Sequence, residues 1–184
     1  MKRILLCLPL LVALAVPATV HAAPSAKLTT KVHALLSAPE DITTGDEWMK
    51  MGDDVDDVLQ SVVGDTKAKL LMRARAAMAL SHFKSDASKQ ALASVVSDGK
   101  TFWILRSRAA SSLARTYQAE ALPLIQPLLT DSHKRTREGA IKAFGLVDTA
   151  QSKALLQGRL TSEKNSYLKG LINKTLARMK GGSK

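Results

Sequence analysis

The sequence predicts an all-α fold: an α-solenoid of about four helix pairs, preceded by a capping helix. Three observations support this prediction. A basic, alanine-rich motif recurs along the chain at steps of 33, 31 and 32 residues. Apolar residues in each copy follow the i, i+3, i+4 spacing that is typical of amphipathic helices. The 184 residues are 46% apolar but only 4% aromatic, whereas sheets favour aromatic and β-branched residues.

Residues 1–22 are expected to be a cleavable signal peptide, which predicts a periplasmic or secreted protein. A short basic segment precedes the apolar run Ile4–Val16, and small residues at 20 and 22 fit a cleavage site. The run is shorter than the ~20 residues that a membrane-spanning helix needs, so no transmembrane anchor is expected after cleavage. Cys7, the one cysteine of the chain, would be lost with the signal. Disulfides, thiol nucleophiles and Cys-bound metals are therefore not expected.

Residues 23–50 are expected to form a capping helix over 26–37 and an acidic loop with turn chemistry. Residues 23–65 carry three lysines against nine acids, whereas residues 66–184 carry twenty-two bases against seven acids. The sequence leaves three interpretations of the acidic segment around 40–57 open: a removable lid over the basic part, a partner site, or a helix cap.

The recurring motif predicts the second helix of each pair. Its second position is basic in every copy: Arg73, Arg106, Arg137 and Lys169. Small alanine pairs follow this position in the first two copies and allow close approach between helices. The second helices are expected over 67–83, 101–116, 134–146 and 164–179.

The first helices are predicted from apolar pairs that keep the same period. They are expected over 53–63, 86–97, 121–130 and 149–160, with Pro127 kinking the third. Two residues after each second apolar pair come Asp65, Asp98, Asp131 and Ser162. The spacing from this position to the basic residue is eight in the first two pairs and six in the third, which predicts a longer turn in the first two.

These residues resemble the HEAT-repeat family, in the short bacterial form also called HEAT-like or phycobilisome-lyase-like repeats. The resemblance covers residues about 51–180 and leaves 181–184 as a tail. It implies a right-handed solenoid whose second helices line a concave face. It also implies a structural ladder between repeats, made of Asp65, Arg73, Asp98, Arg106, Asp131 and Arg137.

No motif for catalysis or metal binding stands out. The three remaining histidines fall in different elements, and no phosphate loop or nucleophile elbow is present. We therefore expect no catalytic residue, no metal and no cofactor. The cluster Asp53–Asp57 lacks the glycine of a calcium loop and is better explained as acids in the first turn of a helix. Trp48 and Trp103 are expected to be core or end-cap residues, with Trp103 buried between repeats.

The basic residues give the strongest indication of function. The segments that contain the predicted second helices, 66–84, 100–116, 132–147 and 163–180, hold eighteen bases and two acids. The resemblance places this charge on the concave face, where charge of one sign attracts an oppositely charged partner. The candidate partner-binding residues, which avoid the ladder position, are Arg75, Arg108, Arg115, Lys142 and Lys174.

The sequence thus predicts a non-enzymatic, monomeric adaptor that binds a protein or an anionic envelope component. Two alternatives remain open. A nucleic-acid-binding solenoid would use the same face, but export argues against that partner. A lyase-like or chaperone-like helper in cofactor attachment is suggested only by relatives of this type of repeat.

Overall fold

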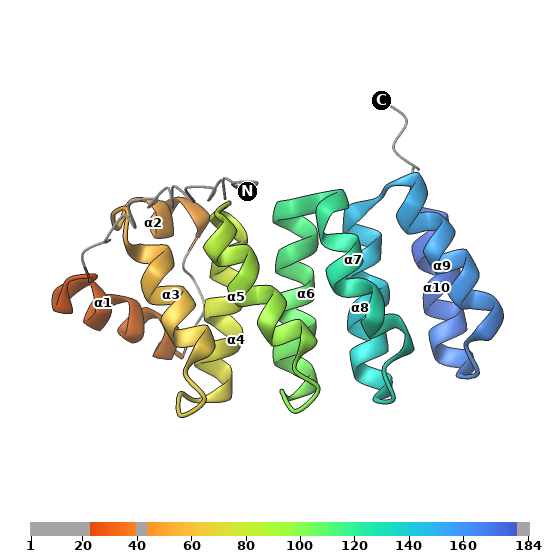
Figure 1. Cartoon of the computed structure of the whole chain (residues 1–184), viewed down its shortest axis with the longest axis horizontal. Coiled ribbons are helices and arrows are strands. Elements are labelled where there is room, and N and C mark those ends of the chain that lie inside the picture. The colour runs from red at the N-terminus through yellow and green to blue at the C-terminus, as the bar shows by residue number, and fades with distance from the viewer. Residues whose placement is uncertain (1–22, 40–43, 180–184) are drawn as a thin grey trace, which may run out of the picture.

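A computed structural model describes residues 23–39 and 44–179, and the described residues are helical without strands. The predicted signal peptide (1–22) and the tail (181–184) lie outside these residues. Figure 1 shows the helices in a row that follows the order of the chain. The helices are α1 (Ala26–Ser37), α2 (Gly45–Met49), α3 (Val55–Gly64), α4 (Leu70–Ala79), α5 (Asp86–Ser97), α6 (Trp103–Tyr117), α7 (Leu122–Ile125), α8 (Lys134–Val147), α9 (Ala150–Ser162) and α10 (Ser166–Arg178).

The helices from α3 onward form the four expected pairs: α3 with α4, α5 with α6, α7 with α8, and α9 with α10. The predicted kink is present, because α7 ends at Ile125 and Gln126–Thr130 continues as a 3-10 helix containing Pro127. Proline lacks the amide hydrogen that a continued α-helix would need at this point. Short 3-10 helices also follow α4 and α6, over Leu80–His82 and Gln118–Ala121.

The prediction of a loop between the capping helix and the first pair was wrong for Gly45–Met49, which forms α2. The Thr44 hydroxyl accepts a hydrogen bond from the amide of Glu47, and the Glu47 carboxylate accepts one from the amide of Thr44. These two bonds form a capping box, which satisfies amides that a helix start otherwise leaves unpaired. Hydrogen bonds that the Glu47 carboxylate accepts from the amide and the hydroxyl of Thr44 lower the pKa of Glu47.

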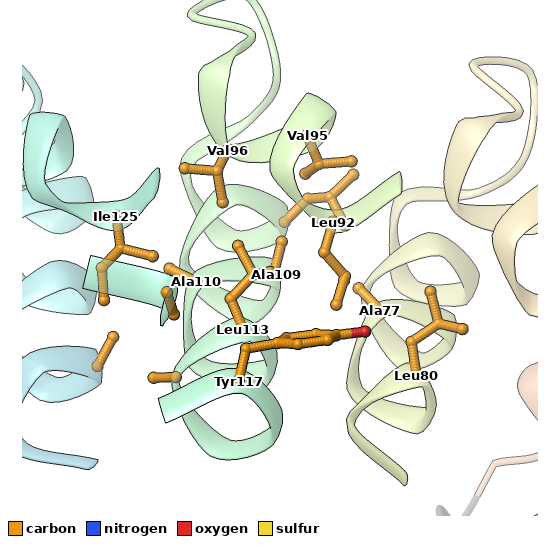
Figure 2. Packing of buried hydrophobic residues seen from close by; sticks show 14 of the residues in the cluster. Ala77, Leu80, Leu92, Val95, Val96, Ala109, Ala110, Leu113, Tyr117 and Ile125 are labelled. Atoms are coloured by element: carbon orange, nitrogen blue, oxygen red, sulfur yellow. The ribbon is translucent and has the colours of Figure 1, made fainter. Parts of the chain in front are cut away.

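A continuous hydrophobic core runs between the helix pairs (Figure 2). Leu92 and Val96 of α5 lie over Ala109, Ala110 and Leu113 of α6. The described core extends from Val32 to Met179, so a chain that begins at Ala23 contains all of it. Burial of aliphatic side chains at roughly 25 cal/mol per Å² is the main stabilising contribution.

Successive second helices pack directly on one another, and small residues make this possible. Gly139 of α8 faces Ser107 of α6, and Gly145 of α8 faces Thr175 of α10. A methyl group on either glycine would overlap the facing side chain.

We expect Gly139→Ala to lower the free energy of unfolding by about 1–3 kcal/mol, because the added methyl group overpacks the contact between α6 and α8. Urea denaturation of the chain from Ala23 measures the change. Adding Ser107→Gly removes the overlapping side chain and should recover part of the loss. Equal stabilities of Gly139→Ala and the wild-type chain would contradict the close approach of these helices.

Helices α1 and α2 close the N-terminal end of the solenoid. Arg75 of α4 donates hydrogen bonds to the carbonyls of Leu36 and Ala38 at the end of α1, at 3.0 and 2.5 Å. Trp48 of α2 is only 4% exposed, and Gly45 lies directly against His82. The capping helix is thus tied to the first pair by polar as well as apolar contacts.

Candidate functional site

An acidic residue ends the first helix of each pair. Asp65, Asp98, Asp131 and Glu163 are the C-cap residues of α3, α5, the 3-10 helix Gln126–Thr130 and α9. Each carboxylate accepts a hydrogen bond from the backbone amide two residues later, at 2.8–2.9 Å. The equivalent position in the fourth pair is therefore Glu163, and the assignment of Ser162 to it was wrong.

Three ladder arginines connect α4, α6 and α8 to the end of the first helix or to the turn of their own pair and, in two cases, to the next pair. Arg73 and Arg106 donate from Nε to the carbonyls of Val63 and Val96. Arg106 also forms an ion pair with Asp131 of the following pair at 2.6 Å. Burial alone would raise the pKa of Asp131, but hydrogen bonds from the His133 amide and Arg106 outweigh it, and the pKa is lowered.

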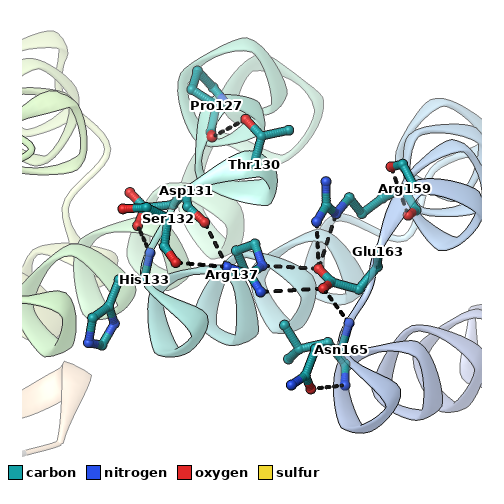
Figure 3. Close-up of polar contacts among 11 residues, drawn as sticks. Pro127, Thr130, Asp131, Ser132, His133, Arg137, Arg159, Glu163 and Asn165 are labelled. Carbon is teal, nitrogen blue, oxygen red and sulfur yellow. Dashed lines mark hydrogen bonds and ion pairs between the residues drawn. The ribbon is translucent and has the colours of Figure 1, made fainter.

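Arg137 continues the ladder with different partners because its turn is shorter (Figure 3). The turn runs over residues 131–133, whereas the turns before α4 and α6 run over 65–69 and 98–102. The six-residue spacing lets Arg137 donate to the carbonyls of Asp131 and Ser132 and to the Glu163 carboxylate, at 3.0 Å from Nε. The predicted difference in turn length is confirmed.

Glu163 is the most buried acid of the ladder. It is 2% exposed and pairs with both Arg137 and Arg159. Burial raises the pKa of this carboxyl. Hydrogen bonds from Arg159, the Asn165 amide and Arg137 outweigh this effect and lower the pKa to about 2. The cluster joins α8, α9 and the start of α10.

A groove with a volume of about 620 Å³ lies on the second helices α4 and α6, where they face α1 and α2. Three basic residues line it: Arg75, Arg108 and Arg115. The remaining lining residues are hydroxyl, amide, imidazole or apolar, and none is acidic among the described residues: Leu35, Leu36, Trp48, Met78, Ala79, Ser81, His82, Ser111, Ser112, Gln118 and Leu146.

The three arginines of the groove differ in how they are held. Arg75 is half-buried and bonded to the end of α1. Arg108 and Arg115 are exposed, and among the described residues their guanidinium groups have no hydrogen-bond or ion-pair partner. They stand seven residues apart on α6, two helical turns along the same face and about 10 Å apart along the axis. Their donors are therefore available to a ligand.

The other two candidate binding residues do not line this groove. Lys142 pairs with Glu138 at 2.6 Å on α8, and Lys174 is exposed on α10. The polar residues that line the groove were not predicted from the sequence. Ser111 and Ser112 stand where the first motif copy has Met78 and Ala79, and this departure from the repeat was the available signal.

The acidic cluster and Trp103, both noted in the sequence, lie at structural positions outside the groove. Asp56 and Asp57 lie in the first turn of α3, as predicted. Trp103 is only half-buried, contrary to the prediction; its ring stacks on His133 at 6.2 Å and lies 5.0 Å from the Arg135 guanidinium. In residues 23–39 and 44–179, no cluster of acids and histidines has a composition suited to a metal ion. Over the same residues, no helix has the length and hydropathy to cross a bilayer.

The fold and the ladder define the class of protein: an α-solenoid of stacked helix pairs, a fold commonly used as a scaffold for protein interactions. Residues 98–177 match the family model of HEAT repeats, which supports the resemblance to HEAT repeats. The match covers α6 to α10 almost completely, and α3 and α4 repeat the same geometry before it. No curated protein matches the chain.

Proposed function

We propose that this chain is an exported, non-enzymatic adaptor whose groove binds an acidic segment of a protein or another anionic envelope component. The observation that carries the proposal is the pair Arg108 and Arg115, two exposed guanidinium groups without partners in a groove that no described acid lines. Most other arginines of the described chain are engaged, by the ladder, by α1 or by an aromatic ring.

The composition of the groove favours a partner with both acidic and apolar side chains. Guanidinium groups bind carboxylates and phosphates through paired hydrogen bonds. Met78 and Leu146 are each 37% exposed and border the same space. Apolar contact would supply affinity, and the cations would supply orientation and a fast approach.

Different observations support export and the non-enzymatic role. Export rests on the pattern of the first 22 residues. The non-enzymatic role rests on the sequence, in which no motif for catalysis stands out.

Photocrosslinking from the groove tests this function. A benzoylphenylalanine at Met78 should capture a partner in cells, whereas the same probe at exposed Ser94 of α5 should not. The crosslink at Met78 should disappear when Arg108 and Arg115 are both changed to Glu. Equal capture from both positions, or capture that survives the charge reversal, would refute groove binding.

A further inference from the structure

Large exposed apolar side chains gather at one edge of the solenoid, outside the groove. Leu71 is 60% exposed, Phe102 55% and Tyr167 52%. All three lie within two residues of the start of a second helix, next to the turn that joins it to the first helix. Figure 1 shows these turns side by side along the lower edge of the molecule. We call residues 65–71, 98–103, 131–135 and 163–167 the turn edge.

Basic residues lie in every turn, beside the apolar ones in three of the four. The turn edge carries six exposed bases: Lys67, Lys69, Lys100, Lys134, Arg135 and Lys164. Two of them lie over aromatic rings, Lys134 at 4.8 Å from the Tyr167 ring centroid and Arg135 at 5.0 Å from that of Trp103.

The four acids of the turn edge offset only part of this charge. Asp131 and Glu163 are paired with the ladder arginines Arg106 and Arg137. The carboxylates of Asp65 and Asp98 accept hydrogen bonds from the amides of their own turns, and Thr101 also donates to Asp98. The exposed carboxylates of Asp65 and Asp98 lie in the same turns as Lys67, Lys69 and Lys100, but no lysine of the turn edge forms an ion pair with an acid among the described residues.

We propose that the turn edge is a docking surface for the headgroup region of an anionic lipid bilayer. A row of cations with interspersed bulky apolar and aromatic side chains matches this interface chemically. Lysine and arginine are attracted to anionic lipid, and aromatic rings favour the boundary between headgroups and acyl chains. The docked solenoid would keep its groove free, because Arg108 and Arg115 lie on α6 beyond the turn edge.

The shape of the surface favours a membrane over an acidic protein. The large exposed apolar side chains lie in three separate turns, as Leu70 with Leu71, Phe102 and Tyr167, rather than in one cluster, and the groove of the molecule lies elsewhere. A protein hot spot needs a central cluster that excludes water. A bilayer accepts separate side chains along a line, each inserted independently.

Vesicle flotation tests the proposal with the chain from Ala23, which holds the described core but lacks the apolar run of the first residues. The wild-type chain should float with vesicles of mixed phosphatidylglycerol and phosphatidylcholine, and less with phosphatidylcholine alone. Binding should weaken as salt is added, because exposed charges are screened beyond a Debye length of ~10 Å at 0.1 M.

Two triple variants locate the binding surface. The charge variant changes Lys67, Lys100 and Lys164 to Gln, and the apolar variant changes Leu71, Phe102 and Tyr167 to Ser. Each should lower partitioning into anionic vesicles by about tenfold or more. A matched control changes the exposed Lys27, Lys31 and Lys50 to Gln, which removes the same charge elsewhere and should leave partitioning nearly unchanged.

Three results would overturn the assignment. They are failure of the wild-type chain to float with anionic vesicles at low salt, an equal effect of the control and the charge variant, and wild-type partitioning of both turn-edge variants. Loss of flotation in Arg108→Glu with Arg115→Glu, but not in the turn-edge variants, would move lipid binding to the groove. Thermal unfolding followed by circular dichroism confirms that each variant is folded.

Discussion

Replacing Glu163 by alanine should lower the free energy of unfolding by about 3 kcal/mol or more, the largest stability effect that we expect from one side chain of the ladder. Glu163 is 2% exposed and neutralises Arg137 and Arg159, which are themselves mostly buried. Its removal leaves two guanidinium groups without their carboxylate and frees the Asn165 amide at the start of α10. Breaking a buried pair on one side is more destabilising than replacing the whole pair by apolar groups.

Denaturant titration of the chain from Ala23 at neutral pH measures this loss. The exposed pair Lys89–Glu120 provides a matched control, since it has a similar N–O distance of 2.6 Å but a glutamate that is 61% exposed. Glu120→Ala should change stability little, because solvent screens exposed pairs. Similar losses for the two substitutions would contradict the structural role of Glu163.

The same carboxyl predicts how stability depends on pH. Its pKa is about 2 in the folded chain, against 4.5 for an unperturbed glutamate. Its contribution is therefore fully present above pH 4.5 and is lost as the pH falls toward 2, because protonation is easier in the unfolded chain. Wild type and Glu163→Gln should differ in stability at pH 7 and converge near pH 2, which thermal melts across this range can follow.

Reversing both free cations of the groove should weaken binding of a short peptide of alternating Glu and Leu by about a hundredfold or more. Arg108→Glu with Arg115→Glu replaces two donors by two acceptors that repel the peptide carboxylates. Folding should be unaffected, because both side chains are exposed and have no partner among the described residues. Fluorescence anisotropy of the labelled peptide gives the dissociation constant.

The double substitution Lys142→Glu with Lys174→Glu makes the same change in net charge outside the groove. It separates an effect of the groove residues on peptide binding from an effect of the overall positive charge, because neither lysine lines the groove. If the peptide binds in the groove, the control should weaken binding by much less than the groove variant. Added salt should remove most of the difference in dissociation constant between the two variants. Comparable weakening by both double variants would favour a delocalised basic surface instead.

The pattern of the repeats was sufficient to predict most of the fold. The helices expected over 26–37 and 86–97 have the same bounds in the structure, because capping serines and apolar spacing define both. The pattern was misleading at Thr44 and Glu47, where turn-forming residues are also a capping box. It was also misleading at Ser162, because the acid that ends α9 is displaced by one residue.

The groove was less predictable than the fold. All five candidate binding residues lie on second helices, but only Arg75, Arg108 and Arg115 line the groove. Whether a base is free depends on neighbours far away in sequence, as the bonds of Arg75 to the end of α1 show. The spacing of residues along the sequence does not predict such contacts.

Hydrogen exchange of the chain with and without the acidic peptide tests the groove most directly. We expect slower amide exchange in α6 and at the end of α4, whose side chains line the groove, and unchanged exchange in the first helices α5 and α7. Protection confined to α5 and α7, or spread evenly over the solenoid, would contradict the groove as the binding surface.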